Sequence, residues 1–277
     1  MLLATVLVLL GACVTVPSPA ERRIRADALA ADRSWRPVPL TASGFPMLAY
    51  APDAPTSAAI LTVYMEGDGA AWASPDQASD DPTPVDPIGL RLALAHPDRA
   101  VAYLGRPCQY LETDASRCTD RYWTEMRYAP EVIDAVDAAV ESMKSRFQAQ
   151  RLILVGYSGG GTVAALVAAR RTDVDQLVTV AANLDHARWT ALHHVTPLAG
   201  SLNAADFADR LRTIPQWHFV GGRDRVVEPA VARSYAGRFA ADEQPVIIVE
   251  PVYDHRCCWV ENWPRLWREG PGLSKSP

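Results

Sequence analysis

A five-residue segment, Gly156-Tyr157-Ser158-Gly159-Gly160, constrains the fold of this chain more than any other feature. It follows directly on the apolar run 151–155, which has the length and composition of a buried strand, and a helix-like pattern over 162–171 comes next. A G-x-S-x-G segment at a strand-to-helix turn forces its serine into strained backbone geometry and exposes the serine Oγ above the sheet. Flanking glycines are needed because side chains there would collide with the adjoining strand and helix. The segment therefore predicts Ser158 as a nucleophile, the alternative being an ordinary glycine-rich turn.

Strands and helices alternate along most of the chain. This alternation predicts an α/β fold with a mostly parallel central sheet flanked by helices on both faces. The length of 277 residues suits one domain of this kind. We predict a single domain over 41–277, preceded by a tether over 13–40 and a signal peptide over 1–12. The expected strands are 45–51, 58–65, 100–104, 151–155, 176–181, 216–220 and 246–250, and the expected helices are 88–95, 130–148, 162–171, 228–239 and 259–267.

An acid and a histidine follow two later strands, where side chains could serve the serine. A serine hydroxyl needs a base to take its proton, and the base needs a carboxylate to orient it. In open α/β sheets such groups lie at the carboxyl ends of strands. Asp224 follows strand 216–220, and His255 follows strand 246–250. We predict Ser158, Asp224 and His255 as the catalytic residues, with Asp185, after the strand that follows the elbow, as the alternative acid.

With these residues in this order, the chain resembles the α/β-hydrolase fold family over about residues 45–267. The resemblance rests on the elbow at Ser158, on the G-x-x-D that ends at Asp224 and on the late His255. It implies an α/β-hydrolase fold in which Ser158 attacks the substrate, His255 acts as general base and then general acid, and Asp224 fixes the imidazole tautomer. We expect no cofactor. No C-x-x-C pair is present, so we expect no metal site either.

The loop Glu66-Gly67-Asp68-Gly69 is expected to complete an oxyanion hole. Such a hole needs two backbone N–H donors, and Gly159, the residue after the nucleophile, is predicted as one. Gly67 and Asp68 are the candidates for the other, and the choice stays open. Members of the family usually carry His-Gly or Gly-Gly here, so the two acids are a departure. A carboxylate beside a forming oxyanion would repel it. The Asp68 side chain must therefore point away, bond elsewhere in the loop or meet a cationic part of the substrate.

The N-terminus predicts export. Residues 1–10 are almost wholly apolar and run into Leu10-Gly11-Ala12-Cys13, which resembles a bacterial lipoprotein signal. The apolar stretch is too short for an ordinary membrane-spanning helix. Cys13 is then the predicted site of lipid attachment, and Val14 after it suggests an outer-membrane anchor facing the periplasm. No Lys or Arg precedes the apolar run, so a plain secretory signal or a short apolar tail is the alternative.

The remaining cysteines agree with an oxidising compartment. Apart from Cys13 there are four, an even number. A bridge between Cys108 and Cys118 would close a short loop and stabilise the fold by about 3 kcal/mol. Cys257 and Cys258 are adjacent. They could form a vicinal disulfide, pair with the other two or stay reduced, and the sequence leaves these choices open.

The charge and the tryptophans narrow the range of partners. Lys and Arg number 27 against 32 Asp and Glu, and no basic stripe is present, so nucleic acid is not an expected partner. Trp72, in the long loop 71–87, and Trp123 and Trp189 fall in loops expected around the mouth of the site, which favours a small-molecule acyl ester over a peptide. We therefore expect an exported serine hydrolase that cleaves carboxylic esters. A peptidase or amidase on the same residues and a non-catalytic envelope-binding lipoprotein are the alternatives.

Overall fold

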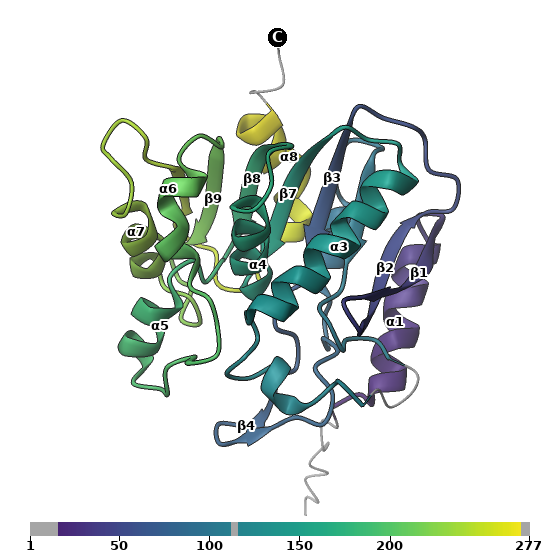
Figure 1. Cartoon of the computed structure of the whole chain (residues 1–277), viewed down its shortest axis with the longest axis horizontal. Coiled ribbons are helices and arrows are strands. Elements are labelled where there is room, and N and C mark those ends of the chain that lie inside the picture. The colour runs from purple at the N-terminus through teal and green to yellow at the C-terminus, as the bar shows by residue number, and fades with distance from the viewer. Residues whose placement is uncertain (1–15, 112–115, 273–277) are drawn as a thin grey trace, which may run out of the picture.

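A central sheet organises the molecule (Figure 1). Within residues 16–111 and 116–272, which this computed structural model describes, eight strands form the sheet in the order β1-β2-β6-β3-β7-β8-β9-β10. A separate hairpin of two short strands lies in the segment 71–87, which the sequence predicts as a loop. The strands of the sheet are β1 (Trp35–Ala42), β2 (Phe45–Pro52), β3 (Ile60–Met65), β6 (Val101–Leu104), β7 (Arg151–Tyr157), β8 (Val174–Val180), β9 (Gln216–Gly221) and β10 (Val246–Glu250), and those of the hairpin are β4 (Trp72–Ser74) and β5 (Gln77–Ala78).

Most of the sheet is parallel. The neighbours from β6 through β3, β7, β8 and β9 to β10 all pair in parallel, whereas β2 is antiparallel to both β1 and β6. Crossover helices connect the parallel strands, as their geometry requires. The helices are α1 (Pro19–Ala31), α2 (Ile88–Leu94), α3 (Pro130–Arg146), α4 (Gly159–Ala168), α5 (His186–His193), α6 (Ala208–Leu211), α7 (Pro229–Ala236) and α8 (Trp259–Glu269), with 3-10 turns at Asp120–Tyr122 and Ala204–Phe207.

Each face of the sheet has its own hydrophobic core, because side chains alternate along a strand. In β7, Leu152 and Leu154 point into a core that contains residues of α3 and α4. Ile153 and Val155 point into the other core, which contains residues of α1, α2 and α8. Figure 1 shows α3 and α4 in front of the sheet and α8 behind it. The predicted fold class, an α/β fold with a mostly parallel sheet and helices on both faces, is confirmed.

The segment predicted as a tether is folded where the structure describes it, so the prediction is wrong for residues 19–40. Ser18 caps α1 in a capping box with Glu21, and one face of α1 is fully buried. All eight residues of β1 then pair with β2. The sequence does not predict this strand because it contains Pro37 and Pro39, which are unusual in strands. They are tolerated because β1 lies at the edge of the sheet, where a missing N–H breaks no ladder.

The predicted signal peptide and Cys13 lie outside the described residues. Among the residues that the structure does describe, no helix has the length and apolar character needed to span a bilayer. Cys108 and Cys118, the predicted pair, are joined by a disulfide with an S–S distance of 2.03 Å. This bridge ties the segment after β6 to the approach of α3.

Candidate active site

Ser158 occupies the turn between the last residue of β7 and the first residue of α4. Its backbone has φ 51° and ψ −123°, a conformation that is costly for a residue with a side chain. The Ser158 N–H donates to the Val180 carbonyl at 2.9 Å, which ties the turn to β8. A Cβ on Gly156 or on Gly160 would overlap neighbouring backbone, so glycine is required at both positions. The elbow thus holds the Ser158 hydroxyl at the carboxyl edge of the sheet.

His255 bridges Ser158 and Asp224. His255 Nε2 lies 3.0 Å from Ser158 Oγ, and Nδ1 lies 2.8 Å from Asp224 Oδ2. The Asp224 side chain is fully buried, and that of His255 is 13% exposed. The other carboxylate oxygen of Asp224 accepts the N–H groups of Val226 and Val227, each at 2.8 Å. The acid is therefore fixed in orientation by its own loop, and the structure brings the three predicted residues together.

This arrangement can activate a serine. With Asp224 accepting the Nδ1–H of His255, the lone pair of Nε2 faces the Ser158 hydroxyl and can take its proton. Tyr157 steadies the histidine loop, since its hydroxyl donates to the His255 carbonyl at 3.0 Å. The centroids of the Tyr157 and His255 rings lie 5.5 Å apart.

The alternative acid lies elsewhere. One oxygen of Asp185 accepts from Ser234 Oγ at 2.6 Å, and the other accepts the Arg188 N–H and the Asn203 side chain, each at 3.1 Å. Asp185 therefore caps the start of α5, and among the described contacts it makes none with His255. His218, inside β9, is a core residue as its apolar surroundings indicate. Burial lowers the pKa of His218 to about 3.

The loop after β3 lies against the serine. A Cβ on Gly67 would stand 3.3 Å from the Ser158 Cβ. The Gly67 N–H donates to Glu66 Oε1 at 3.0 Å, so one of the two candidate donors is already engaged. Among the described residues, the N–H groups of Asp68 and Gly159 have no acceptor. Of the predicted oxyanion donors, the structure therefore favours Gly159 and Asp68 over Gly67.

Glu66 points away from the serine and ties its loop to α2. Besides the Gly67 N–H, its carboxyl group accepts the N–H groups of Gly89 and Leu90 at 3.1 and 3.3 Å and the Tyr103 hydroxyl at 2.9 Å. Burial raises the pKa of Glu66, and these donors oppose that rise. Glu66, the first of the two acids that depart from the family pattern, is thus a buried residue that holds its loop to α2.

Asp68 points into a cluster of arginines. Its carboxylate lies 2.8 Å from Arg127 Nη1 and 3.1 Å from Arg106 Nη1, and the Tyr128 hydroxyl donates to it at 3.3 Å. Burial by itself would raise the pKa of Asp68, but the two guanidinium groups outweigh it and lower that pKa. One carboxylate and two guanidinium groups leave the cluster with an excess positive charge. Sequence reasoning missed both arginines, because they lie in the segment between β6 and α3, which carries no motif.

A cavity of about 490 Å³ opens over Ser158 and His255. Of the three predicted mouth residues, Trp72 and Trp189 line it, and so does Arg127. Trp123 does not, because it is buried in the hydrophobic core, where its Nε1 donates to the Ser79 carbonyl at 3.0 Å. Apolar side chains complete the wall, among them Val85, Ile88, Val226 and Val227. In the described part of the chain, no group of three or more His, Cys, Asp or Glu residues is placed to hold a metal ion.

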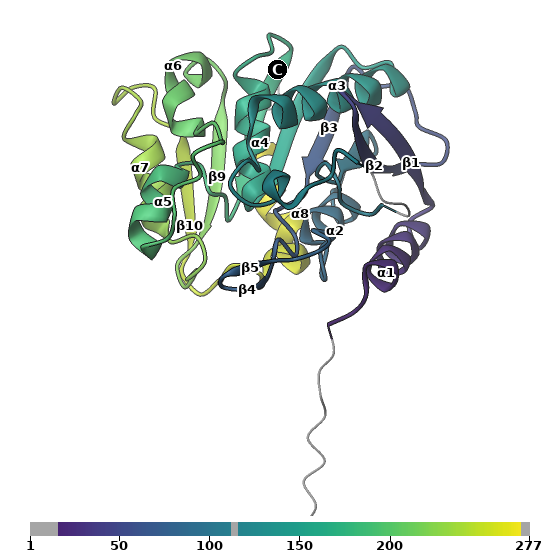
Figure 2. The same cartoon turned by 60° about the horizontal axis from the view of Figure 1, so that its bottom comes forward.

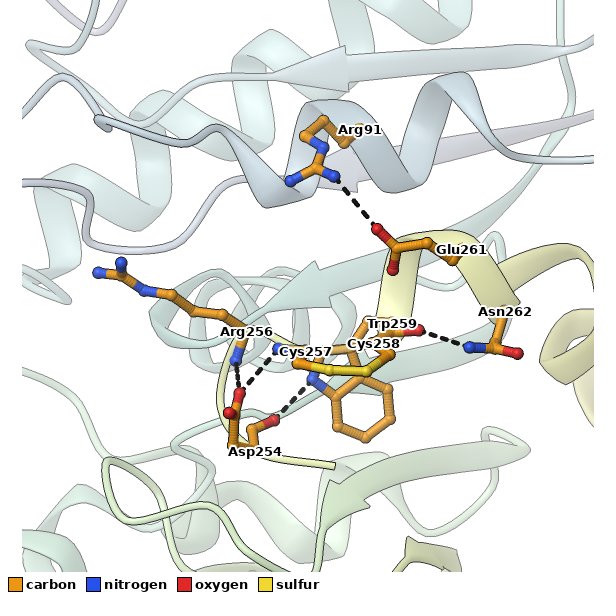
Figure 3. The surroundings of a disulfide bond; sticks show 8 residues. All are labelled: Arg91, Asp254, Arg256, Cys257, Cys258, Trp259, Glu261 and Asn262. Carbon is orange, nitrogen blue, oxygen red and sulfur yellow. Dashed lines mark hydrogen bonds and ion pairs between the residues drawn. A yellow bond between two sulfur atoms is a disulfide. The ribbon is translucent and has the colours of Figure 1, made fainter. Parts of the chain in front are cut away.

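A second disulfide follows the histidine. Cys257 and Cys258, whose pairing the sequence leaves open, are bonded to each other (Figure 3). Asp254 Oδ1 accepts the N–H groups of Arg256 and Cys257 at 2.8 and 2.7 Å, and Trp259 Nε1 donates to the Asp254 carbonyl at 3.0 Å. The loop that carries His255 is therefore closed by its own backbone contacts and anchored to the buried start of α8.

Comparisons with known proteins rest on structure. No protein-family model matches this chain, and no curated protein matches its sequence. Solved structures do match. XC6422 from Xanthomonas campestris, described as an α/β serine hydrolase without a lid, aligns with a TM-score of 0.57 and 13% identity over 88% of this chain and 97% of its own. The chain therefore shares the α/β fold of this solved structure.

Two further solved structures are similar to the same extent. Est1E from Butyrivibrio proteoclasticus has a TM-score of 0.57 and 13% identity, and the match covers 86% of this chain and 98% of Est1E. The Pyrococcus furiosus esterase Pf2001 has a TM-score of 0.55 and 14% identity over 87% of this chain and 90% of its own. At such identities these structures show the fold alone, and the chemistry has to be argued from this chain's own residues.

Proposed function

We propose that this protein is an exported serine hydrolase that cleaves carboxylic esters. The hydrogen-bonded chain from Asp224 through His255 to Ser158 carries the proposal, since it supplies a nucleophile, a base and an orienting acid in contact. The structural likeness to proteins described as esterases supports an ester as the substrate. The apolar wall of the cavity, with Trp72 and Trp189, suits an acyl group.

The proposed reaction proceeds through an acyl-enzyme. Ser158 Oγ bonds to the ester carbonyl carbon while its proton passes to His255 Nε2. The negative charge that develops on the carbonyl oxygen is stabilised by the N–H groups of Gly159 and Asp68. The carbon–oxygen bond to the alcohol then breaks, and His255 returns the proton to the leaving alcohol. A water, deprotonated by His255, attacks the acyl carbon and releases the carboxylic acid together with Ser158.

We further propose that the mature chain is held to a membrane by a lipid on Cys13. The apolar run before this cysteine and the small residues Gly11 and Ala12 support it. The bridge between Cys108 and Cys118 fits an oxidising compartment outside the cytoplasm. A lipid anchor would hold the protein at the outer membrane, facing the periplasm, without a spanning helix.

A fluorophosphonate probe tests the nucleophile. We expect the signal-free protein to be labelled and Ser158→Ala to lose the label, while Ser145→Ala, which changes an exposed serine on α3, keeps it. A panel of p-nitrophenyl esters and aminoacyl amides then identifies the scissile bond. Equal labelling of wild type and Ser158→Ala would refute the proposed nucleophile, and turnover of amides alone would make the protein a peptidase or amidase. Loss of metabolic palmitate labelling in Cys13→Ser tests the anchor.

A further inference from the structure

We propose that the mouth of the cavity faces the membrane that holds the anchor, and that the substrate is an acyl ester of a lipid in that membrane. The inference rests on the proposed function, both the ester hydrolysis and the lipid on Cys13.

Val16, which precedes α1, lines the cavity together with Ser158 and His255. In both Figure 1 and Figure 2, the start of α1 lies at the same end of the molecule as β4, whose Trp72 also lines the cavity. The point at which a lipidated segment would leave the domain is therefore beside the active-site opening.

Hydrogen bonds fix this exit point to the cavity wall. Arg22 donates from Nε to the Pro17 carbonyl at 2.8 Å and from Nη1 to the Thr83 carbonyl at 2.9 Å. Arg25 donates to the carbonyl of Val85, which lines the cavity, at 3.3 Å. Because Arg22 is buried, the start of α1 cannot swing away from the segment 83–85 without breaking buried contacts.

The connection to the anchor is short. Cys13 precedes Val16 by three positions, and an extended chain advances at most about 3.6 Å per residue, so the lipidated residue stays within roughly 11 Å of the opening. A domain of this length has a radius of gyration of roughly 19 Å. The segment between Cys13 and Val16 is thus shorter than the radius of gyration of the domain. The face that carries the opening is held against the bilayer, and the opposite end of the sheet is held away from it.

Three exposed apolar side chains lie at the opening, beside the exposed Arg256. Trp72 on the hairpin is 47% exposed and Val226 in the loop after β9 is 49% exposed, and both line the cavity. Val16 adds a third exposed apolar side chain at the same opening. Tryptophan favours the boundary between headgroups and acyl chains. Exposed apolar side chains are ordinary when scattered, but here they gather around one opening beside the anchor.

Two substrates separate membrane entry from hydrolysis itself. The lipidated protein is reconstituted in vesicles of phosphatidylethanolamine and phosphatidylglycerol that contain a fluorogenic phospholipid ester, and p-nitrophenyl butyrate serves as the soluble substrate. The readout is the ratio of the two rates. We expect Trp72→Ser to lower this ratio about tenfold. Val246→Ser is the matched control, because Val246 is 44% exposed but lies at the opposite end of the sheet, and we expect it to leave the ratio unchanged.

An insertion tests whether the short segment between Cys13 and Val16 is needed, and it changes no residue of the domain. A Gly/Ser linker of roughly 20 residues between Val14 and Thr15 frees the opening from the bilayer, and we expect the ratio to fall about tenfold as the effective concentration drops. Unchanged ratios in Trp72→Ser and in the linker variant would overturn the inference while soluble-ester hydrolysis persisted. Loss of soluble-ester hydrolysis and of fluorophosphonate labelling in the intact protein would instead refute the proposed function.

Discussion

The carboxylate of Asp68 lies directly against the backbone of Gly159, so closely that a methyl group added to Gly159 would overlap it. These two residues supply the N–H groups of the proposed oxyanion hole, so a full negative charge stands beside the place where another would form. Arg127 and Arg106 bind that carboxylate at 2.8 and 3.1 Å. The charge that would oppose the reaction is therefore offset within the cluster itself.

Replacing Gly159 by alanine should disable the site. The added Cβ would force either the Asp68 carboxylate or the start of α4 to shift, and both moves displace an oxyanion donor. Because losing one such donor costs about 10²-fold in rate, we expect kcat for p-nitrophenyl butyrate to fall by about that factor with little change in KM. Gly237→Ala, where the added Cβ would meet its nearest neighbour at 3.4 Å, is the matched control. Wild-type kcat in Gly159→Ala would contradict the placement of the oxyanion.

Arg127 should matter to the rate because it neutralises Asp68. In Arg127→Gln the partly buried carboxylate keeps Arg106 but loses its closer partner, and the potential at the oxyanion becomes more negative. We expect kcat to fall by roughly 10- to 100-fold, which steady-state kinetics on p-nitrophenyl butyrate would measure.

The double variant Asp68→Asn/Arg127→Gln distinguishes charge compensation from simple packing. Removing both charges leaves no unpaired carboxylate, so we expect it to recover most of the kcat that Arg127→Gln loses. Melting temperatures of Asp68→Asn, Arg127→Gln and the double variant serve as the control for folding. If the losses in the two single variants simply add in the double variant, the cluster holds the loop in place and does not act through its charge.

The framework was predictable because local patterns specify it. The apolar run at 151–155 is the core of β7, and the residues after it form the elbow and α4. The predicted helix begins three residues too late. Gly159, Gly160 and Gly161 are poor helix formers, yet they form the first turn of α4, and glycine is required there because a Cβ on any of them would overlap a neighbour. Close packing around the elbow overrides intrinsic propensity at those positions.

The meeting of Ser158, Asp224 and His255 follows from topology, since carboxyl ends of parallel strands gather at one edge. The orientation of the Asp68 carboxylate does not follow from topology. The sequence requires its carboxylate to avoid the oxyanion, but its partners Arg106 and Arg127 lie 38 and 59 positions along the chain. No periodicity links residues in irregular segments to a distant loop. Such tertiary ion pairs become visible only once the segment between β6 and α3 is placed.

Asp224→Asn should separate orientation from folding. The asparagine Oδ1 can still accept the N–H groups of Val226 and Val227, so the loop is preserved. The amide nitrogen would then face His255 Nδ1 and donate to it, which favours the tautomer whose Nε2 carries a proton and cannot accept one from Ser158. We expect kcat to fall by about 10⁴-fold with a melting temperature close to wild type. Unaltered kcat in Asp224→Asn would mean that Asp224 is not the catalytic acid, and that either Asp185 or no carboxylate has this role.

The stability of the domain at low pH should depend on Asp173, remote from the site. Its carboxylate lies 2.7 Å from Arg171 Nη2 and 2.5 Å from Lys144 Nζ. Burial opposes ionisation, but these partners outweigh it and lower the pKa of Asp173 from 3.8 to about 2. A lowered pKa in the folded state stabilises the fold above the ordinary value, and that contribution is lost as pH falls toward 2.

We therefore expect Asp173→Asn to reduce the free energy of unfolding by about 1 kcal/mol at neutral pH, a figure discounted for the partly exposed partners. The difference from wild type should shrink between pH 4 and pH 2, as urea unfolding followed by circular dichroism would show. Asp242→Asn is the control, because Asp242 is exposed and has no ion-pair partner among the described residues. A penalty in Asp173→Asn that stays constant down to pH 2 would mean that the hydrogen-bond geometry at this position, and not its charge, stabilises the fold.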